Sequence, residues 1–138
     1  MAGGPMQDPQ LDPKDIVAIE QVLARYTHVM DARDWDGLAR VFLQDAVLDY
    51  ADLGCPVMNG LQEVRDFFDQ AQHPVAHNLT SPVVESSAED IAVVRSKWLN
   101  PAPDWSMSAG DFLDEFVRTV DGWRIARRTG TRRLNRRS

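Results

Sequence analysis

Apolar residues recur every three or four positions near the start of the chain. Residues at this spacing share one face of an amphipathic helix, and here they are Ile16, Ile19, Leu23, Tyr26 and Met30. Asp12 precedes Pro13, and an aspartate cap followed by a proline at the first helical position is typical of a helix start. We therefore predict a long helix that begins after Asp12.

Two further helices are expected before residue 73. Asp34 is suited to cap a short helix whose inward side would be Leu38, Val41 and Phe42. The stretch "AVLDYADL" then predicts a strand, which Gly54 and Pro56 end. The third helix is predicted over residues 61–72, with an apolar side formed by Leu61, Val64, Phe67, Phe68 and Ala71.

Beyond residue 74 the hydrophobic period shortens to two, which is typical of strands. The stretches "VAHNLTSPVVES", "DIAVVRSKWL", "DFLDEFVRTV" and "WRIARRTGT" show this alternation. Asp121-Gly122 predicts a hairpin between the last two, because both residues tolerate a positive φ. Three helices followed by strands indicate an α+β fold, in which a curved, cone-shaped sheet, antiparallel or mixed, wraps the helices. Such a sheet is expected to enclose an apolar pocket for a small ligand.

Composition supports one globular domain. The chain has 138 residues, of which 43% are hydrophobic and 26% charged, as in ordinary folded domains. We expect a single domain over residues 12–131, a disordered tail over 1–11 and a basic tail over 132–138. No apolar stretch reaches the length of a membrane span, and the start lacks the pattern of a signal peptide. One cysteine, Cys55, allows no internal disulfide, so we predict a cytoplasmic protein.

The net charge of −6 hides a basic C-terminal end. The stretch "RTVDGWRIARRTGTRRLNRRS" carries eight arginines, and most acids lie upstream of it. A nucleic acid or an acidic partner is one interpretation. The favoured one is a final strand with a solvated end, because binding of a polyanion generally needs a broad basic face. Nucleic acid is therefore not expected as a partner, and neither is a membrane.

Asp31 is the first candidate for a catalytic group. It stands near the expected end of the first helix, where the helix dipole disfavours a negative charge. A residue that opposes local stability often serves function. Its azimuth is at the rim of the apolar stripe, so it would reach a pocket only where the helix ends or bends. The alternative is a solvated residue in the link between two helices. Asp34 and Asp36 are explained as a cap and a first-turn carboxylate.

His77 is the second candidate. In "VAHNLTS" it would share one side of a strand with Val75 and Leu79, and an imidazole among apolar neighbours can act as a base near neutral pH. A buried neutral histidine bonded to a backbone carbonyl is the competing interpretation. His28 and His73 are expected to be solvated.

Further residues are candidates to line the pocket. The hydroxyls of Tyr26 and Tyr50 would polarise a substrate oxygen, although core packing also explains both residues. Asp114 shares strand parity with Phe112 and Phe116, so it is either an acid on the apolar face or an exposed edge residue. Arg127 shares a face with Trp123 and Ile125 under the same alternation. The full set of predicted substrate-binding residues is Met30, Met58, Trp98, Phe112, Asp114, Trp123 and Arg127.

Several stretches in this order resemble a known family. They are "IEQVLARYTHVMDARDWDGLARVFLQDAVLDY", "NGLQEVRDFF", "AHNLTS" and "DEFVRTVDGWRI", and together they resemble the SnoaL-like group of the nuclear transport factor 2-like superfamily over residues 15–129. The resemblance implies a cone-shaped α+β barrel with a deep pocket, and a dimer formed through the outer face of the sheet. Members include dehydratases, isomerases and polyketide cyclases, and others that only bind or assemble.

The dehydratases of the group are the most similar in motif. Tyr26, Asp31 and His77 stand where bile acid 7α-dehydratase has its tyrosine, aspartate and histidine. Scytalone dehydratase is similar in Asp31, Tyr50 and His77, whereas Met30 replaces its tyrosine beside the aspartate and its second histidine falls near Gly110.

The resulting hypothesis is a lyase or isomerase that acts on a hydrophobic, oxygenated ring compound such as a steroid or polyketide. His77 would move a proton, Asp31 would orient the imidazole, and Tyr26 and Tyr50 would bind the oxygen that gains charge. This chemistry needs no metal, nucleotide or thiol, so no cofactor is expected. The alternative is a module of the same fold that carries or senses an apolar ligand without reaction.

Overall fold

The computed structural model describes residues 11–133, and this range contains the whole predicted domain, residues 12–131. The tails predicted over residues 1–11 and 132–138 lie outside the described residues, apart from Leu11, Arg132 and Arg133. Arg132 is the last residue of the final strand rather than the first of a tail.

The helical part contains two α-helices and two short 3-10 helices. Helix α1 spans Pro13–Ala32 and begins at Asp12, whose side chain accepts a hydrogen bond from the backbone N–H of Lys14. The 3-10 helix η1 spans Trp35–Arg40, and the side chain of Asp34 caps it at the backbone N–H of Gly37. The 3-10 helix η2 spans Ala51–Leu53, and helix α2 spans Leu61–Gln70. The predicted caps at Asp12 and Asp34 are confirmed.

Six strands form one mixed sheet in the order β2-β1-β6-β5-β4-β3. Their bounds are β1 Phe42–Asp49, β2 Val57–Asn59, β3 Leu79–Ala88, β4 Ile91–Pro101, β5 Met107–Thr119 and β6 Gly122–Arg132. Strand β1 pairs with β6 in parallel, and the other neighbours are antiparallel. The sheet is curved but not closed, so the α+β prediction is confirmed in this form.

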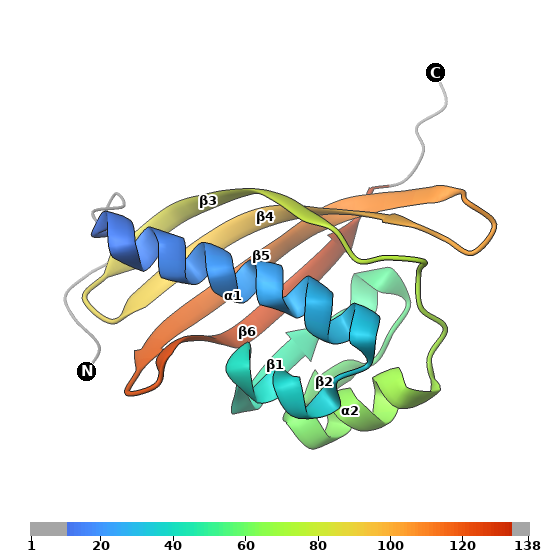
Figure 1. Ribbon diagram of the computed structural model, residues 1–138, viewed down its shortest axis with the longest axis horizontal. Helices are drawn as coiled ribbons and strands as arrows, with labels where there is room; N and C mark the ends of the chain where they lie inside the picture. The colour runs from blue at the N-terminus through green and yellow to red at the C-terminus, as the bar shows by residue number, and fades with distance from the viewer. Residues whose placement is uncertain (1–10, 134–138) are drawn as a thin grey trace.

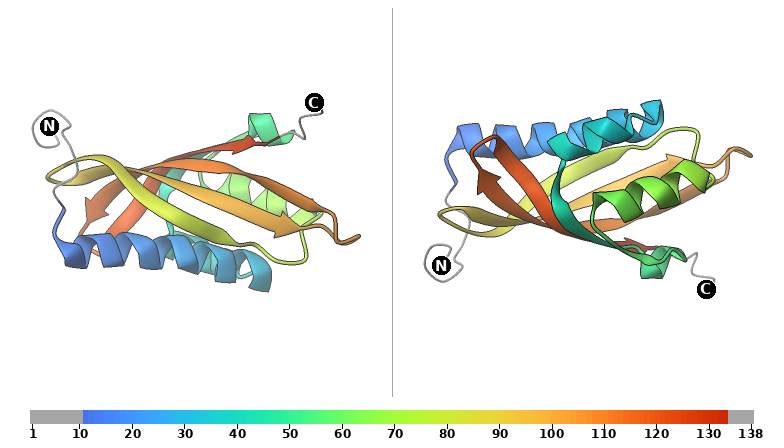
Figure 2. Two further views of the ribbon diagram at one scale, coloured as in Figure 1. Left: turned by 90° about the horizontal axis from the view of Figure 1, so that it is seen from above. Right: turned by 90° about the horizontal axis from the view of Figure 1, so that it is seen from below.

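The helices occupy one side of the sheet and form the core with it. Figures 1 and 2 show α1 lying across the concave face, with α2 near β1 and β2 at one end. The buried stripe of α1 packs against alternating residues of the strands, such as Val94 on β4 and Phe116 on β5. No helix within residues 11–133 combines the length and the apolar character that crossing a bilayer requires.

Three local predictions need correction. Phe42 is the first residue of β1 and not part of the second helix. Strand β3 begins at Leu79, so His77 lies in the loop before it and Val75 is largely exposed. The hairpin predicted between the last two strands is present, but its turn consists of residues 120 and 121, because Thr119 pairs with Gly122, which has φ 109°. Gly122 therefore supplies the positive φ from within the strand.

Candidate active site

Asp31 lies in the last turn of α1, where the chain leaves the helix abruptly. Arg33 has φ 56°, a left-handed conformation, and its backbone N–H donates to the carbonyls of Met30 and Val29. The guanidinium of Arg33 also donates to the carbonyl of Met30 over 2.7 Å. These bonds satisfy carbonyl groups at the helix end. The side chain of Asp31 remains 39% exposed and turns to the loop that carries His77.

Asp31 holds His77 at two points. Its Oδ1 accepts the backbone N–H of His77 over 2.9 Å and the ring Nδ1 over 2.7 Å. A carboxylate only accepts hydrogen bonds, so Nδ1 carries the ring hydrogen and Nε2 keeps its lone pair. Because His77 precedes β3, its backbone N–H is available for this bond and does not enter the ladder of the sheet.

His77 has the protonation state of a base at neutral pH. Its side chain is 9% exposed, and burial lowers the pKa of His77 below the ordinary value of 6.5, although the hydrogen bond and charge of Asp31 act to raise it. Desolvation disfavours the charged imidazolium. The imidazole is therefore neutral at pH 7, with Nε2 able to accept a proton.

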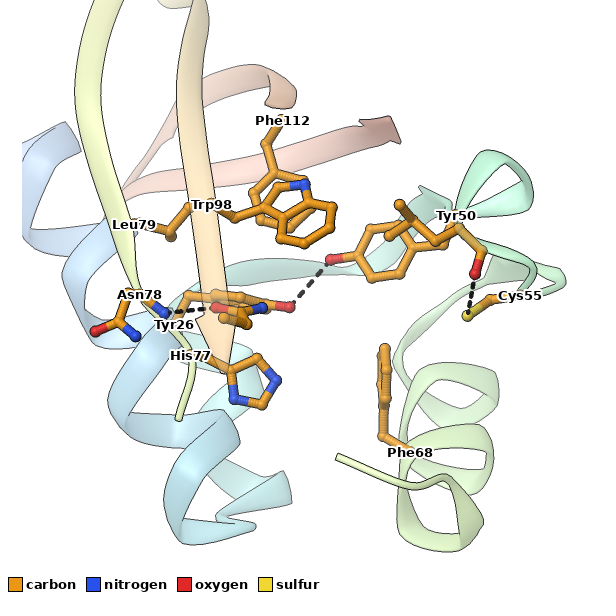
Figure 3. A pocket seen from close by; sticks show the side chains of 11 residues that line it. Tyr26, Tyr50, Cys55, Phe68, His77, Asn78, Leu79, Trp98 and Phe112 are labelled. Carbon is orange, nitrogen blue, oxygen red and sulfur yellow. Dashed lines mark hydrogen bonds between the residues drawn. The ribbon is translucent and has the colours of Figure 1, made fainter. Parts of the chain in front are cut away.

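A chamber of about 120 Å³ lies beside this ring. Figure 3 shows His77 projecting into it below Tyr26, with Tyr50 and Phe68 on the opposite side. The lining residues are Tyr26, Tyr50, Leu53, Cys55, Phe68, His77, Asn78, Leu79, Trp98, Asn100 and Phe112. Aromatic rings dominate the wall, and the polar groups are few, as in pockets for small organic ligands.

Tyr26 and Tyr50 meet at the chamber from different elements. Their hydroxyl oxygens are 3.1 Å apart, so one hydroxyl donates to the other. Burial raises the pKa of Tyr26, and burial together with the neighbouring Tyr26 raises the pKa of Tyr50 well above 10. Both phenols are therefore neutral donors. The ring of Tyr26 also meets that of His77 edge to face, with centroids 6.2 Å apart.

Behind the phenols lies a fully buried ion pair. Arg128 donates from Nε and Nη2 to the two oxygens of Asp114 over 2.7 and 2.9 Å, and both side chains are 0% exposed. The guanidinium carbon stands 4.3 Å from the centre of the Tyr26 ring and 4.0 Å from that of Phe112. These are cation–π contacts in a desolvated setting.

Arg128 keeps its positive charge in this buried position, and one nitrogen of its guanidinium is not used by Asp114. Burial opposes the charge, but Asp114 and the two phenols together raise the pKa of Arg128 above its usual value. Nη1 is buried without a hydrogen-bond partner among the described residues. Such an orphan donor next to a site calls for an explanation. The charge of Arg128 acts on both tyrosines, where it opposes the rise in pKa that burial causes.

A β-bulge explains why Arg128 and not Arg127 faces inward. An unbulged hairpin closed by Thr119 and Gly122 would pair Asp114, five positions before Thr119, with Arg127, five positions after Gly122. The ladder shifts by one between the Phe116–Ile125 and Glu115–Arg127 pairs, so Asp114 pairs with Arg128. Arg127 points to the other face and contacts Asp49 over 3.4 Å. The alternation used to place Arg127 fails at the bulge.

The structure places four other predicted binding residues outside the chamber. Met30 and Met58 are 0% and 2% exposed within the core, where their side chains fill space between the helices and the sheet. Trp123 lies at the other end of α1, where its Nε1 donates to Asp15. Asp114 is buried on the apolar side, which contradicts the interpretation as an exposed edge residue, and its carboxylate binds Arg128 rather than lining the chamber. Of the predicted binding residues, Trp98 and Phe112 line the chamber.

Part of the lining of the chamber is not predicted from the sequence. Phe68 is predicted as plain core of the third helix, whereas Leu53, Cys55 and Asn100 come from turns and a strand end. Asn78 follows His77 directly, and its backbone N–H donates to Oδ1 of Asn100 over 2.9 Å. The adjacency of Asn78 to the candidate base is a usable signal, and no periodicity marks the others.

The prediction that His73 is solvated is wrong. Its ring stacks on that of Trp35 with centroids 6.0 Å apart, and its Nε2 donates to the carbonyl of Phe68 over 2.7 Å. The ring centroid of His73 is 5.8 Å from that of His77. The loop that carries both histidines is thereby held against α2. Within residues 11–133 no group of three or more His, Cys, Asp or Glu residues is arranged to hold a metal ion.

Comparison with known proteins gives consistent results. Residues 13–129 match the family of SnoaL-like domains. An uncharacterized protein of Mycobacterium tuberculosis is 35% identical over 131 residues, which cover 86% of this chain and 85% of that protein. A candidate aromatic ring hydroxylase of Novosphingobium aromaticivorans is 28% identical, with a TM-score of 0.79 and coverage of 91% of this chain and 94% of that one. A candidate scytalone dehydratase of the same organism is 19% identical with a TM-score of 0.73 over 88% and 85% of the two chains, a likeness in fold alone.

Proposed function

The chain belongs to the family of SnoaL-like domains, and we propose that it is a cofactor-independent acid–base enzyme, a dehydratase or isomerase, acting on an apolar, oxygenated ring compound. One observation carries this proposal. Nδ1 of His77 donates to Asp31 over 2.7 Å while the ring lines an aromatic chamber. A histidine oriented by a carboxylate, with its second nitrogen free, is the usual arrangement of a general base.

The proposed reaction begins at a carbon next to a substrate carbonyl. Nε2 of His77 takes a proton from this carbon, and the electron pair moves into the carbonyl to form an enolate. Re-formation of the carbonyl expels a hydroxyl group from the next carbon, and the imidazolium returns the proton to it, so water leaves and a conjugated ketone remains. Return of the proton to a different carbon would instead give an isomer.

Asp31, the phenols and Arg128 support this sequence at different stages. Asp31 fixes the tautomer and stabilises the imidazolium that forms. The phenol of Tyr26 or Tyr50 that is not donating to the other donates to the enolate oxygen. Arg128, which lies behind both phenols, is a positioning residue whose charge favours negative charge on that oxygen. Proton transfer of this kind contributes about 10²- to 10⁴-fold in rate, and a removed oxyanion donor costs about 10²- to 10³-fold.

The test assays the proposed type of reaction on several classes of ring compound rather than on a single substrate. Monocyclic and fused β-hydroxy ketones are incubated with the protein in D2O, and NMR follows deuterium entering next to the carbonyl while ultraviolet absorbance follows the conjugated ketone. We expect turnover of at least one ring class, and a loss of about 10²- to 10⁴-fold in His77→Ala.

His28→Ala provides the matched control. His28 is exposed on the far side of α1, so its removal should leave turnover unchanged. Equal rates in wild type and His77→Ala would remove His77 from the mechanism. Ring compounds that bind the wild type without exchange or turnover would favour the alternative, a module that carries or senses a ligand.

A further inference from the structure

We propose that the substrate carries an anionic group, a carboxylate on a short tail, and that Arg132 binds this group at the mouth of the chamber. The inference rests on the proposed function for the reaction at the ring, but it concerns a separate part of the site. It follows from a second hollow, from the direction of Arg132 and from the lack of an acidic partner for its side chain.

Beside the chamber lies a wider hollow of about 310 Å³, which we call the mouth. The two share Leu53, Trp98 and Asn100 as common walls. The remaining mouth residues are Gln72, His73, Pro74, Ala102, Pro103, Ser108 and Arg132. Among these described residues, Arg132 carries the permanent charge. The site therefore combines an aromatic inner part with a polar and positive outer part.

Strand β6 directs Arg132 to this mouth. Residues two apart on a strand share a face, so Arg132 follows Arg128 and Gly130 on the concave side. Gly130 lies against the chamber, since a Cβ there would come within 3.2 Å of Phe112 and Tyr50. Four residues of strand span about 13 Å, and this distance is a rough measure of the length from the phenols to the mouth.

The side chain of Arg132 is available for a ligand. Arg128 pairs with Asp114, Arg127 with Asp49, and Arg133 with Asp111. Arg132 is exposed, and its backbone N–H donates to Asp52 over 2.9 Å. Its guanidinium forms no hydrogen bond or ion pair with any residue in the range 11–133. A guanidinium is well suited to bind a carboxylate through two parallel hydrogen bonds.

The size of the chamber indicates how the ligand divides between the two parts. A cavity of about 150 Å³ accepts a benzene ring, and the chamber measures about 120 Å³. One ring therefore fills the inner part, and in this proposal the tail passes the shared residues Trp98 and Asn100 into the mouth. There the side-chain N–H groups of Asn100 are free to donate, because its Oδ1 is the atom that accepts from Asn78.

The test measures binding of unreactive probes by calorimetry. Phenylacetate, 3-phenylpropanoate and 4-phenylbutanoate are compared with the corresponding alcohols at about 20 mM salt, where exposed charge pairs are least screened. We expect at least one acid to bind about three- to tenfold more tightly than its alcohol. This preference should disappear in Arg132→Gln, persist in part in Arg132→Lys and shrink at 0.5 M salt.

Arg95→Gln is the matched control, because Arg95 is exposed beside Glu85 on the opposite face of the sheet and its loss changes the net charge equally. Equal binding of acids and alcohols by the wild type, an equal loss in Arg95→Gln, or no binding of either probe at millimolar concentration would overturn the inference. The outcome of this binding test is independent of whether the protein catalyses the proposed reaction. A protein that shows the Arg132-dependent preference but no turnover would keep the anion site and lose the enzyme.

Discussion

At the scale of single residues, one carboxylate oxygen determines what His77 can do. Oδ1 of Asp31 accepts both the backbone N–H and Nδ1 of His77, so the position of the loop and the tautomer of the ring depend on the same atom. Asp31 stands at the unfavourable end of a helix dipole, and the bonds to His77 account for its presence there.

We predict the effect of Asp31→Asn on the pH dependence of kcat/KM. Burial lowers the pKa of His77 and Asp31 raises it, so wild-type activity should be constant at neutral pH and fall through a midpoint below 6.5. Without the carboxylate the pKa of His77 falls further, so this midpoint moves to lower pH. The plateau should drop at least tenfold, because the imidazolium loses its counter-charge.

Asp36→Asn is the control for Asp31→Asn, since Asp36 is 87% exposed and pairs with Arg65. Its pH profile should match that of the wild type. A midpoint that stays in place in Asp31→Asn, or moves upward, would contradict the assigned role of Asp31.

The residues of the candidate site differ in how far the sequence reveals them. Asp31 breaks a rule of helix stability, and its spacing to Tyr26 resembles that of known dehydratases, so two features of the sequence indicate a function for it. No comparable feature of the sequence indicates Arg128. One extra residue in β6 reverses the alternation, and a bulge leaves no periodic mark in the sequence. The roles of Asp31, His77, Tyr26 and Tyr50 stay predictions, to which the structure adds their mutual distances.

At the scale of elements, strands β5 and β6 carry the buried pair. Removing one partner of such a pair leaves an uncompensated charge and costs about 3–5 kcal/mol. We therefore expect Arg128→Met to reduce the free energy of unfolding by about this amount in urea denaturation. The double variant Asp114→Val/Arg128→Met should recover much of the loss, because no charge then remains buried.

An exposed ion pair serves as the control for the buried pair. Arg95 and Glu85 are 52% and 43% exposed, and Arg95→Met should cost at most about 1 kcal/mol. If the loss of stability in the double variant equals the sum of the losses in Asp114→Val and Arg128→Met, Asp114 and Arg128 are not energetically coupled.

Element boundaries are predictable where a cap or a period is strong and less so where a loop competes. Helix α1 starts at the predicted cap because proline and aspartate act locally. The secondary structure predicted for Phe42 and His77 is wrong, because apolar character alone does not tell a strand end from a helix or a loop. The chamber itself is assembled from segments far apart in sequence, and its lining is not readable from any one of them.

At the scale of the whole molecule, we expect a homodimer formed through the outer face of the sheet. This face exposes Val83, Leu99 and Leu113, which are 53%, 47% and 37% accessible. Light scattering should give twice the chain mass for the wild type and a shift to monomer for Leu113→Lys, which places a charge among these side chains. Val120→Lys, at the fully exposed turn, should leave the mass unchanged. A wild-type monomer at micromolar concentration would refute the expected dimer.

The two bonds from Asp31 to His77 have a consequence for product escape. The loop before β3 borders the chamber and is anchored there partly through Asp31. If this loop lifts to let a molecule out, both bonds break together, and the ring hydrogen becomes free to move between the two nitrogens. Nε2 of His77 is then fixed as the proton acceptor only while the loop is bound to Asp31. Release of product and loss of the base would therefore occur in the same step.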